Sequence, residues 1–232
     1  MEFMPEGPKA IPLWINGRAF LTMAPSFFEV VNPQTGTAQY QVPLCGADEA
    51  QEAVAAARAA LPGWQEMSAA DRQAALAALA DALANYAGHF AKLLRGDTGV
   101  DEAQAQADVA AAIAALREGE AGVGGLIGVV VDAGQPLAGF AATAAPIWRA
   151  GGCVVVKPSP KAPSAIFALC ELTSRAGWPG GVVNLLQGDT EAITGLCATE
   201  IDRLVYSGDA ALGAQVGAIA TAAGKPFSLR AA

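Results

Sequence analysis

The sequence predicts a doubly wound α/β fold built on a five-stranded parallel sheet and preceded by a small antiparallel ribbon and by helices. Three observations lead to this prediction. Short β-rich runs separated by glycine, proline and asparagine fill residues 13–44, alanine-rich segments fill residues 47–118, and short apolar runs alternate with helical segments from Gly125 onward. Strands that are apolar on both faces, each followed by one helix, are typical of a parallel sheet covered on both sides.

Residues 13–44 are expected to form the antiparallel ribbon, because turn residues separate their short strands. The alanine-rich segments carry leucines at helical spacing, with the charged residues on one side of each apolar stripe. They predict helices over residues 47–61, 68–94 and 101–118. Ser68 and Asp101 stand where N-caps are expected.

The second half of the chain supplies the parallel sheet. Its apolar runs predict strands over residues 126–131, 153–156, 182–186, 204–206 and 227–229, and the segments between them predict helices near residues 137–149, 164–176, 191–199 and 211–223. This alternation is Rossmann-like. We expect one domain over residues 1–232, with the ribbon in 1–46, the helices in 47–120 and the parallel sheet in 121–232.

Composition argues against several classes of partner. The chain has 14 Lys and Arg against 22 Asp and Glu, a net charge of -8, and no basic run, so nucleic acid is not expected. The four cysteines form no CxxC pair, which argues against a metal site, and Cys153 and Cys170 lie in apolar segments where burial is expected. The N-terminus lacks a secretory signal, and Asp132 with prolines and glycines interrupts the most apolar stretch. We expect a cytoplasmic protein without membrane association.

Several motifs occur together in a specific order. They include Ile15-Asn16-Gly17, Asn32-Pro33-Gln34-Thr35-Gly36, Cys153-Val154-Val155-Val156-Lys157-Pro158-Ser159, Ala176-Gly177-Trp178-Pro179-Gly180-Gly181 and Val205-Tyr206-Ser207-Gly208. In this order they resemble the nucleotide-binding half of the aldehyde dehydrogenase superfamily. The resemblance covers nearly the whole chain. The chain is similar to the non-catalytic second half of two-module members resembling family 16.

The resemblance implies a vestigial cofactor site at Lys157, Ser159, Ser207, Gly208 and Gly213. Lys157 ends a strand where doubly wound folds bind nucleotides, although a solvated lysine at a strand end is an equally good interpretation of position alone. Ser207 and Gly208 open a helix whose N-terminus could face a pyrophosphate, although simple turn chemistry is the commoner role of such glycines.

The chain departs from the family pattern where the family carries its chemistry. Gly134 stands in place of the asparagine that donates to the oxyanion, and Arg230 aligns with the general base. None of the four cysteines matches the nucleophile, which lies further downstream in family members. The hairpin arm that family members insert before the first sheet strand is replaced by a glycine-rich connector in residues 117–128. We assign no catalytic residue.

The cofactor pocket departs as well. Pro160 stands where the family has a glutamate for the ribose, and Asp209 brings a carboxylate toward the pyrophosphate. We expect Asp209 to cap the following helix and to have no catalytic role, and a capping carboxylate would still disfavour the anion. We expect no bound cofactor, with NAD or NADP as the only candidates.

Three hypotheses follow from the sequence. The first is an inactive domain that acts as a structural or regulatory subunit, with an intact aldehyde dehydrogenase paralogue or a second copy as its partner. The second is an oxidoreductase component or sensor that binds NAD(P) or an adenylate. The third is one piece of a split or truncated gene.

Overall fold

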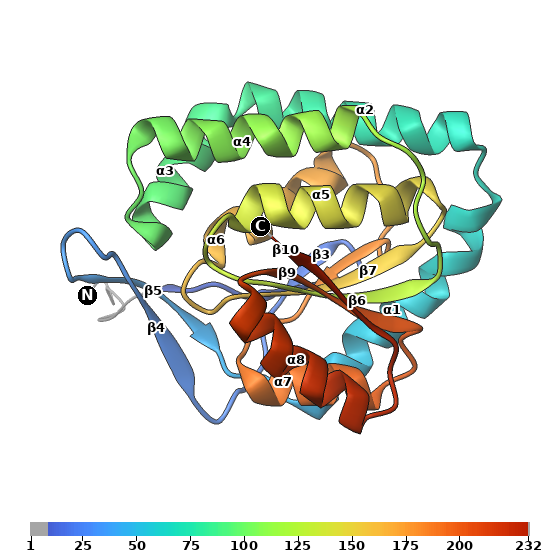
Figure 1. Ribbon diagram of the computed structural model, residues 1–232. Coiled ribbons are helices and arrows are strands. Elements are labelled where there is room, and N and C mark those ends of the chain that lie inside the picture. The colour runs from blue at the N-terminus through green and yellow to red at the C-terminus, as the bar shows by residue number, and fades with distance from the viewer. Residues whose placement is uncertain (1–8, 232) are drawn as a thin grey trace, which may run out of the picture.

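The central sheet of the computed structural model, which describes residues 9–231, contains five parallel strands (Figure 1). They lie side by side in the order β10, β9, β6, β7, β8. Their bounds are β6 (Leu126–Val131), β7 (Cys153–Pro158), β8 (Val183–Leu185), β9 (Arg203–Gly208) and β10 (Phe227–Ala231). The predicted parallel sheet is confirmed. The strand order reverses between β6 and β9, and doubly wound sheets bind ligands outside the carboxyl ends of the strands at such a point.

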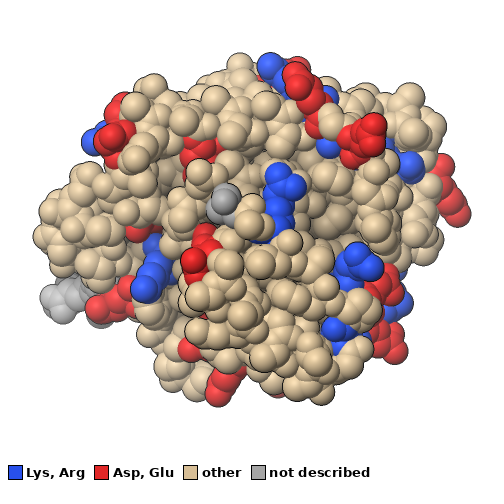
Figure 2. All heavy atoms as spheres, in the orientation of Figure 1, with Lys and Arg blue, Asp and Glu red and all other residues tan. Residues whose placement is uncertain are grey.

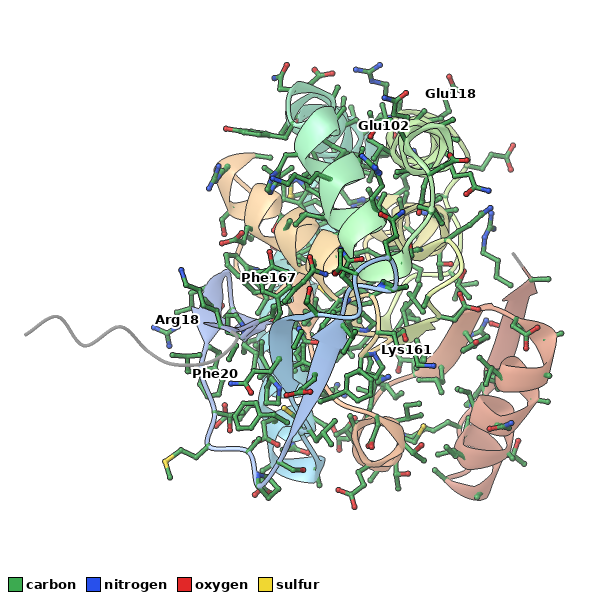
Figure 3. The ribbon with its side chains drawn as sticks, turned by 90° about the vertical axis from the view of Figure 1, so that its left-hand side faces the viewer. Arg18, Phe20, Glu102, Glu118, Lys161 and Phe167 are labelled. Carbon is green, nitrogen blue, oxygen red and sulfur yellow. The ribbon has the colours of Figure 1, made fainter. Side chains whose placement is uncertain are left out.

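An N-terminal hairpin extends this sheet at its β8 edge. Strands β2 (Leu13–Ile15) and β3 (Arg18–Phe20) are antiparallel, and β2 pairs with β8 through Trp14 and Leu185. Asn16 and Gly17 form the connecting turn with positive φ angles of 53° and 74°, as a tight hairpin requires. Trp14 also meets Phe167 edge to face at 6.1 Å, and Figure 3 shows Phe20 and Phe167 on this side of the molecule.

The expected single ribbon over residues 13–44 is therefore divided between two sheets. Strands β1 (Lys9–Ala10), β5 (Ala38–Pro43) and β4 (Phe27–Val31) form a separate three-stranded sheet in the order β1, β5, β4. Within it β4 and β5 are antiparallel, whereas β1 and β5 are parallel. The division has a physical cause: β2 is buried along its whole length and so completes the main core, whereas most of β4 remains exposed.

Helices cover both faces of the main sheet, which makes the fold doubly wound (Figure 1). One face carries α5 (Pro136–Arg149) and α6 (Ser164–Arg175), with α2 (Ala69–Asn85), α3 (Ala87–Thr98) and α4 (Glu102–Arg117) outside them. The other face carries α1 (Ala47–Glu66), α7 (Thr190–Ala198) and α8 (Ala210–Ala222). Because both faces are covered, every residue of β6 and β7 is buried.

The alanine-rich region differs from the prediction in one respect. The segment 68–94 is not one helix, because Tyr86 leaves the helical conformation with φ −110° and ψ 15° and separates α2 from α3. The break turns α3 so that Phe90 and Leu94 are buried against the core. The predicted N-caps are confirmed: Ser68 accepts a hydrogen bond from Asp71 N, and Asp101 accepts one from Gln104 N.

Three tryptophans form the centre of the helical side of the core. Trp64 stacks on Trp178 at 5.0 Å between ring centroids, and Trp148 meets Trp178 edge to face at 5.0 Å. The indole N–H of Trp64 donates to the Trp148 carbonyl at 3.0 Å. Cys153 and Cys170 are buried as predicted. Among the helices of residues 9–231, none combines the length and apolar composition needed to cross a lipid bilayer.

Candidate functional site

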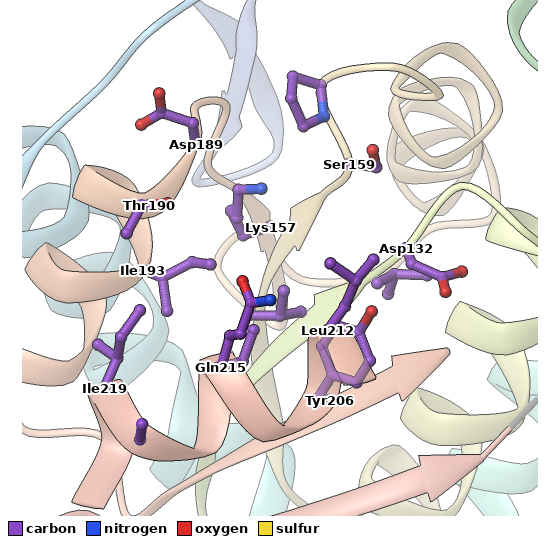
Figure 4. Close-up of a pocket in the computed structure, with 15 residues that line it drawn as sticks. Asp132, Lys157, Ser159, Asp189, Thr190, Ile193, Tyr206, Leu212, Gln215 and Ile219 are labelled. Atoms are coloured by element: carbon purple, nitrogen blue, oxygen red, sulfur yellow. The ribbon is translucent and has the colours of Figure 1, made fainter. Parts of the chain in front are cut away.

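A cavity of about 550 Å³ opens at the carboxyl ends of β6, β7 and β9, between α7 and α8 (Figure 4). It lies at the reversal point of the strand order, where this type of sheet binds ligands. Its polar wall consists of Asp132, Lys157, Ser159, Asp189, Thr190, Tyr206 and Gln215. Its apolar wall includes Val130, Val131, Pro160, Ile193, Leu212, Val216 and Ile219.

Lys157 is the one cation among the described residues that line this cavity. Its side chain is only 4% exposed, so the interpretation as a solvated lysine at a strand end is wrong. No hydrogen bond or ion pair joins its ammonium to another residue of the described chain. Burial lowers the pKa of Lys157 to about 8, although the charge of Asp189 acts in the opposite direction. Ser159 lines the same cavity.

The other three predicted cofactor residues lie elsewhere. Ser207 and Gly208 line a smaller neighbouring cavity of about 200 Å³, together with Asp132, Gln135 and Arg230. Gly213 lines neither cavity. A Cβ at Gly213 would lie 2.7 Å from the Leu229 side chain and 3.0 Å from that of Tyr206, so this glycine allows α8 to approach the sheet.

Two carboxylates occupy the backbone donors at the N-terminus of α8. Asp132 accepts a hydrogen bond from Asp209 N at 2.6 Å, and its second oxygen accepts from Gly134 N at 2.8 Å. Asp209 caps the helix by accepting from Ala211 N at 2.9 Å and Leu212 N at 3.0 Å. A Cβ at Gly208, where φ is 144°, would collide with the Asp132 carboxylate. The group that approaches Gly208 closely is therefore an internal carboxylate, in the place where the sequence suggested a phosphate.

The other helices that follow the parallel strands are capped in the same way. Asp108 of α4 accepts from Ala138 N in the first turn of α5, Asp97 of α3 accepts from Ser164 N at the start of α6, and Asp189 accepts from Glu191 N in α7. An aspartate thus satisfies donors at each of these four N-termini, including α8. Backbone groups at a helix N-terminus bind phosphate only when they are free. The geometry does not fit a dinucleotide pyrophosphate.

Asp97 gives the stability of this network a predictable pH dependence. Burial raises its pKa to about 6, although hydrogen bonds from Ser164 N and Oγ favour the charged form. The folded protein therefore keeps this proton to a higher pH than the unfolded chain, and stability is lost as pH rises from about 4 to about 6.

Asp97→Asn removes that titration. We expect the free energy of unfolding of the unmodified protein to fall by up to about 3 kcal/mol relative to the variant between pH 4 and pH 7.5. Urea unfolding of both proteins at the two pH values measures the difference. If the two proteins differ in free energy of unfolding by the same amount at both pH values, burial does not raise the pKa of Asp97.

Known proteins resemble this chain in sequence and in fold. The sequence profile of the aldehyde dehydrogenase family matches residues 21–231. The chain belongs to the aldehyde dehydrogenase family. It is 34% identical to N-succinylglutamate 5-semialdehyde dehydrogenase of Caulobacter sp. over 209 residues, which cover 79% of this chain and 43% of that protein. It is 27% identical to the NADP+-dependent succinate-semialdehyde dehydrogenase of Escherichia coli over 213 residues, which cover 81% and 44%.

Solved structures give the same result. Aldehyde dehydrogenase C of Pseudomonas syringae, a variant crystallised with NAD+ and octanal, superposes with a TM-score of 0.88 at 26% identity, over 98% of this chain and 51% of that one. A methylmalonate-semialdehyde dehydrogenase of Sinorhizobium meliloti, crystallised with NAD, superposes with a TM-score of 0.89 at 22% identity, over 97% and 50%. The chain spans about half the length of the relatives it matches.

The structure shows the surroundings of the positions that depart from the family pattern. Gly134 is exposed and offers only its backbone N–H, which already donates to Asp132. Arg230 is exposed on β10 and lines the smaller cavity. Residues 118–125, which join α4 to β6, form neither helix nor strand.

No cysteine of this family member is available as a nucleophile. All four are buried, and burial raises the pKa of each thiol, to about 12 for Cys45 and Cys153. A thiol in this condition is almost entirely protonated at neutral pH and unreactive. Within residues 9–231, no three His, Cys, Asp or Glu side chains come together to hold a metal ion.

Asp132 is the site residue that the sequence did not reveal. The sequence showed it only as a charge that interrupts an apolar stretch. A signal was present, because an aspartate directly after a buried strand and two residues before a glycine is typical of a turn closed by the carboxylate. Its contact with Asp209 N joins residues 77 positions apart, which local sequence does not show.

Proposed function

We propose that this chain is a non-catalytic member of its family that acts as a structural or regulatory subunit of a larger dehydrogenase assembly. The observation that carries the proposal is the Asp132 carboxylate on the N-terminus of α8. Relatives of the same fold have been crystallised with NAD. In this chain Asp132 supplies an internal anion at the N-terminus of α8, and a second carboxylate, Asp209, lies beside it. Two close like charges oppose the entry of a pyrophosphate.

The residues around the strand ends support the same proposal. Gly134 lacks a side-chain amide, Arg230 cannot accept a proton, and the four cysteines are buried thiols. These positions therefore supply no thiolate nucleophile, no general base and no side-chain oxyanion donor for aldehyde oxidation. We expect the purified chain to form no NADH or NADPH from aliphatic or aromatic aldehydes.

The surface of α8 and β10 supports association with a dehydrogenase paralogue or with a second copy. β10 pairs only with β9 among the described strands, and Leu229 on it is 43% exposed. α8 carries no charged residue, and Figure 2 shows mostly uncharged side chains over this helix. An edge strand beside an uncharged helix is a surface suited to a protein partner.

Analytical ultracentrifugation of the full chain, alone and with an intact aldehyde dehydrogenase from the same cell, tests the proposal. In one of the two samples we expect this chain to sediment in a complex larger than its 23.4 kDa monomer, and larger than the dehydrogenase alone in the mixed sample. Leu229→Lys should raise the dissociation constant of that complex at least tenfold, because charge on an edge strand opposes pairing. Leu21→Lys is the matched control, since Leu21 is 76% exposed on another part of the surface. A monomer in both samples would contradict the proposal.

A second function, binding of NAD(P) or an adenylate as a sensor, is favoured by one observation. Lys157 and Ser159 still line a cavity large enough for part of a nucleotide. Micromolar binding of NADP or AMP by the unmodified chain would support this second function over the first.

A further inference from the structure

The large cavity contains a buried amine although carboxylates occupy the adjacent N-terminus of α8. Lys157 is buried at the end of β7 without a partner for its amine, in a cavity whose wall between α7 and α8 is apolar. Figure 4 shows its amine directed into the cavity, with Asp189 on one side and Ser159 on the other. Lysines in such surroundings are the ones that proteins use as amine nucleophiles toward carbonyl groups.

A second buried polar group faces the same space. The Tyr206 side chain is 2% exposed, its hydroxyl has no hydrogen-bond partner, and it lines the cavity with Lys157. Burial, together with the charges of Asp132 and Asp209, raises the pKa of Tyr206, so its hydroxyl keeps its proton at neutral pH. The hydroxyl itself is shielded from solvent and interacts with the Asp132 carboxylate, so Tyr206 forms part of the cavity wall and leaves Lys157 as the group that a ligand can reach.

We propose that Lys157 captures small, uncharged ketones and aldehydes with an apolar body, through a reversible imine formed in this cavity. The lysine nitrogen bonds to the carbonyl carbon, the C–O bond breaks, and the oxygen leaves as water with two hydrogens. No oxidant or reductant is consumed. The apolar wall of Ile193, Leu212 and Val216 receives the body of the ligand.

The charges around the cavity select an uncharged ligand. The titratable groups that line it with Lys157 are Asp132 after β6, Asp189 before α7 and Tyr206 on β9, and Asp209 caps the adjacent α8. Three carboxylates disfavour a phosphate or carboxylate on the ligand. The lowered pKa of Lys157, about 8, leaves a usable fraction of free amine at neutral pH.

The test uses the full chain and 2,4-pentanedione, a diketone that condenses with lysine amines to an enaminone with a near-ultraviolet band. At pH 7 we expect Lys157 to react roughly a hundredfold faster than Lys161, because about a tenth of an amine of pKa about 8 is free at that pH. Peptide mapping by mass spectrometry assigns the adduct and separates it from the α-amino group. The rate at Lys157 should rise from pH 6 to about pH 8, as the amine loses its proton.

Three comparisons test whether Lys157 is the reactive amine and whether its cavity prefers an apolar, uncharged ligand. Lys157→Arg and Lys157→Met should abolish the fast enaminone band, whereas Lys161→Arg should leave it unchanged. In the unmodified protein, 2,4-nonanedione should react with Lys157 at least tenfold faster than 2,4-pentanedione, and the anionic acetoacetate more slowly, with no such order at Lys161. The proposal is overturned if Lys157 labels no faster than Lys161 at pH 7, or if chain length has no effect at Lys157. These measurements involve no dinucleotide and no assembly, so they stand apart from the test of the proposed function.

Discussion

Replacing both carboxylates at the start of α8, by Asp132→Asn with Asp209→Ser, should raise the affinity for NAD at least a hundredfold. A close like charge costs about 4 kcal/mol at an effective dielectric constant near 20, whereas a free helix N-terminus contributes about 0.5 to 1 kcal/mol toward an anion. The repulsion therefore dominates in the unmodified protein. Serine is a good N-cap, and asparagine still accepts from Asp209 N, so the fold should survive both changes.

Calorimetric titration of the double variant with NAD measures this gain. Asp101→Ser is the matched control, because Asp101 caps α4 in the same way but does not line the cavity at the strand ends. The control should bind no better than the unmodified chain. If the double variant also fails to bind, the charges at α8 are not what excludes the dinucleotide, and Pro160 or the shape of the cavity becomes the explanation.

Trp148→Ala should lower the free energy of unfolding by about 3 to 5 kcal/mol. Trp148 is fully buried between Phe140, at 5.7 Å between ring centroids, and Trp178, at 5.0 Å. Alanine leaves a cavity beneath three rings that cannot all move into it. For a chain of this size the loss corresponds to a fall in Tm of roughly 10 °C or more.

Thermal and urea unfolding of Trp148→Ala measures the loss. Phe27→Ala, at a residue 44% exposed on β4, is the matched control and should cost less than about 1 kcal/mol. A loss below 1 kcal/mol for Trp148→Ala would mean that the tryptophan cluster does not form the centre of the core.

Local sequence pattern was sufficient for the parallel strands and their helices. β6 begins and ends at the predicted residues, because a run of six apolar residues between Gly125 and Asp132 is buried on both faces. The break at Tyr86 was not predicted, because Gly88, the one glycine near it, lies inside the first turn of α3 and each flanking segment has a good helical pattern. The break depends on the packing of Phe90 against the core, which is a tertiary effect.

The candidate site was also only partly predictable from local sequence. The position of Lys157 and Ser159 at a strand end followed from the alternating pattern and from the resemblance to the family. The occupation of the α8 N-terminus by Asp132 did not, because this contact joins the ends of two strands that are distant in sequence and adjacent in the sheet. Gly213 was placed with the cofactor residues, but its role in the structure is the close packing of α8 on Tyr206 and Leu229.

We propose that this aldehyde dehydrogenase-like fold is closed to the dinucleotide by its own carboxylates. Isothermal titration calorimetry of the unmodified full chain with NAD, and separately with NADP, tests it most directly. Our account predicts no saturable heat up to a ligand concentration of about 1 mM, since a Kd of 1 mM corresponds to only about 4 kcal/mol of binding free energy. Saturable binding of either dinucleotide with a micromolar Kd would contradict it.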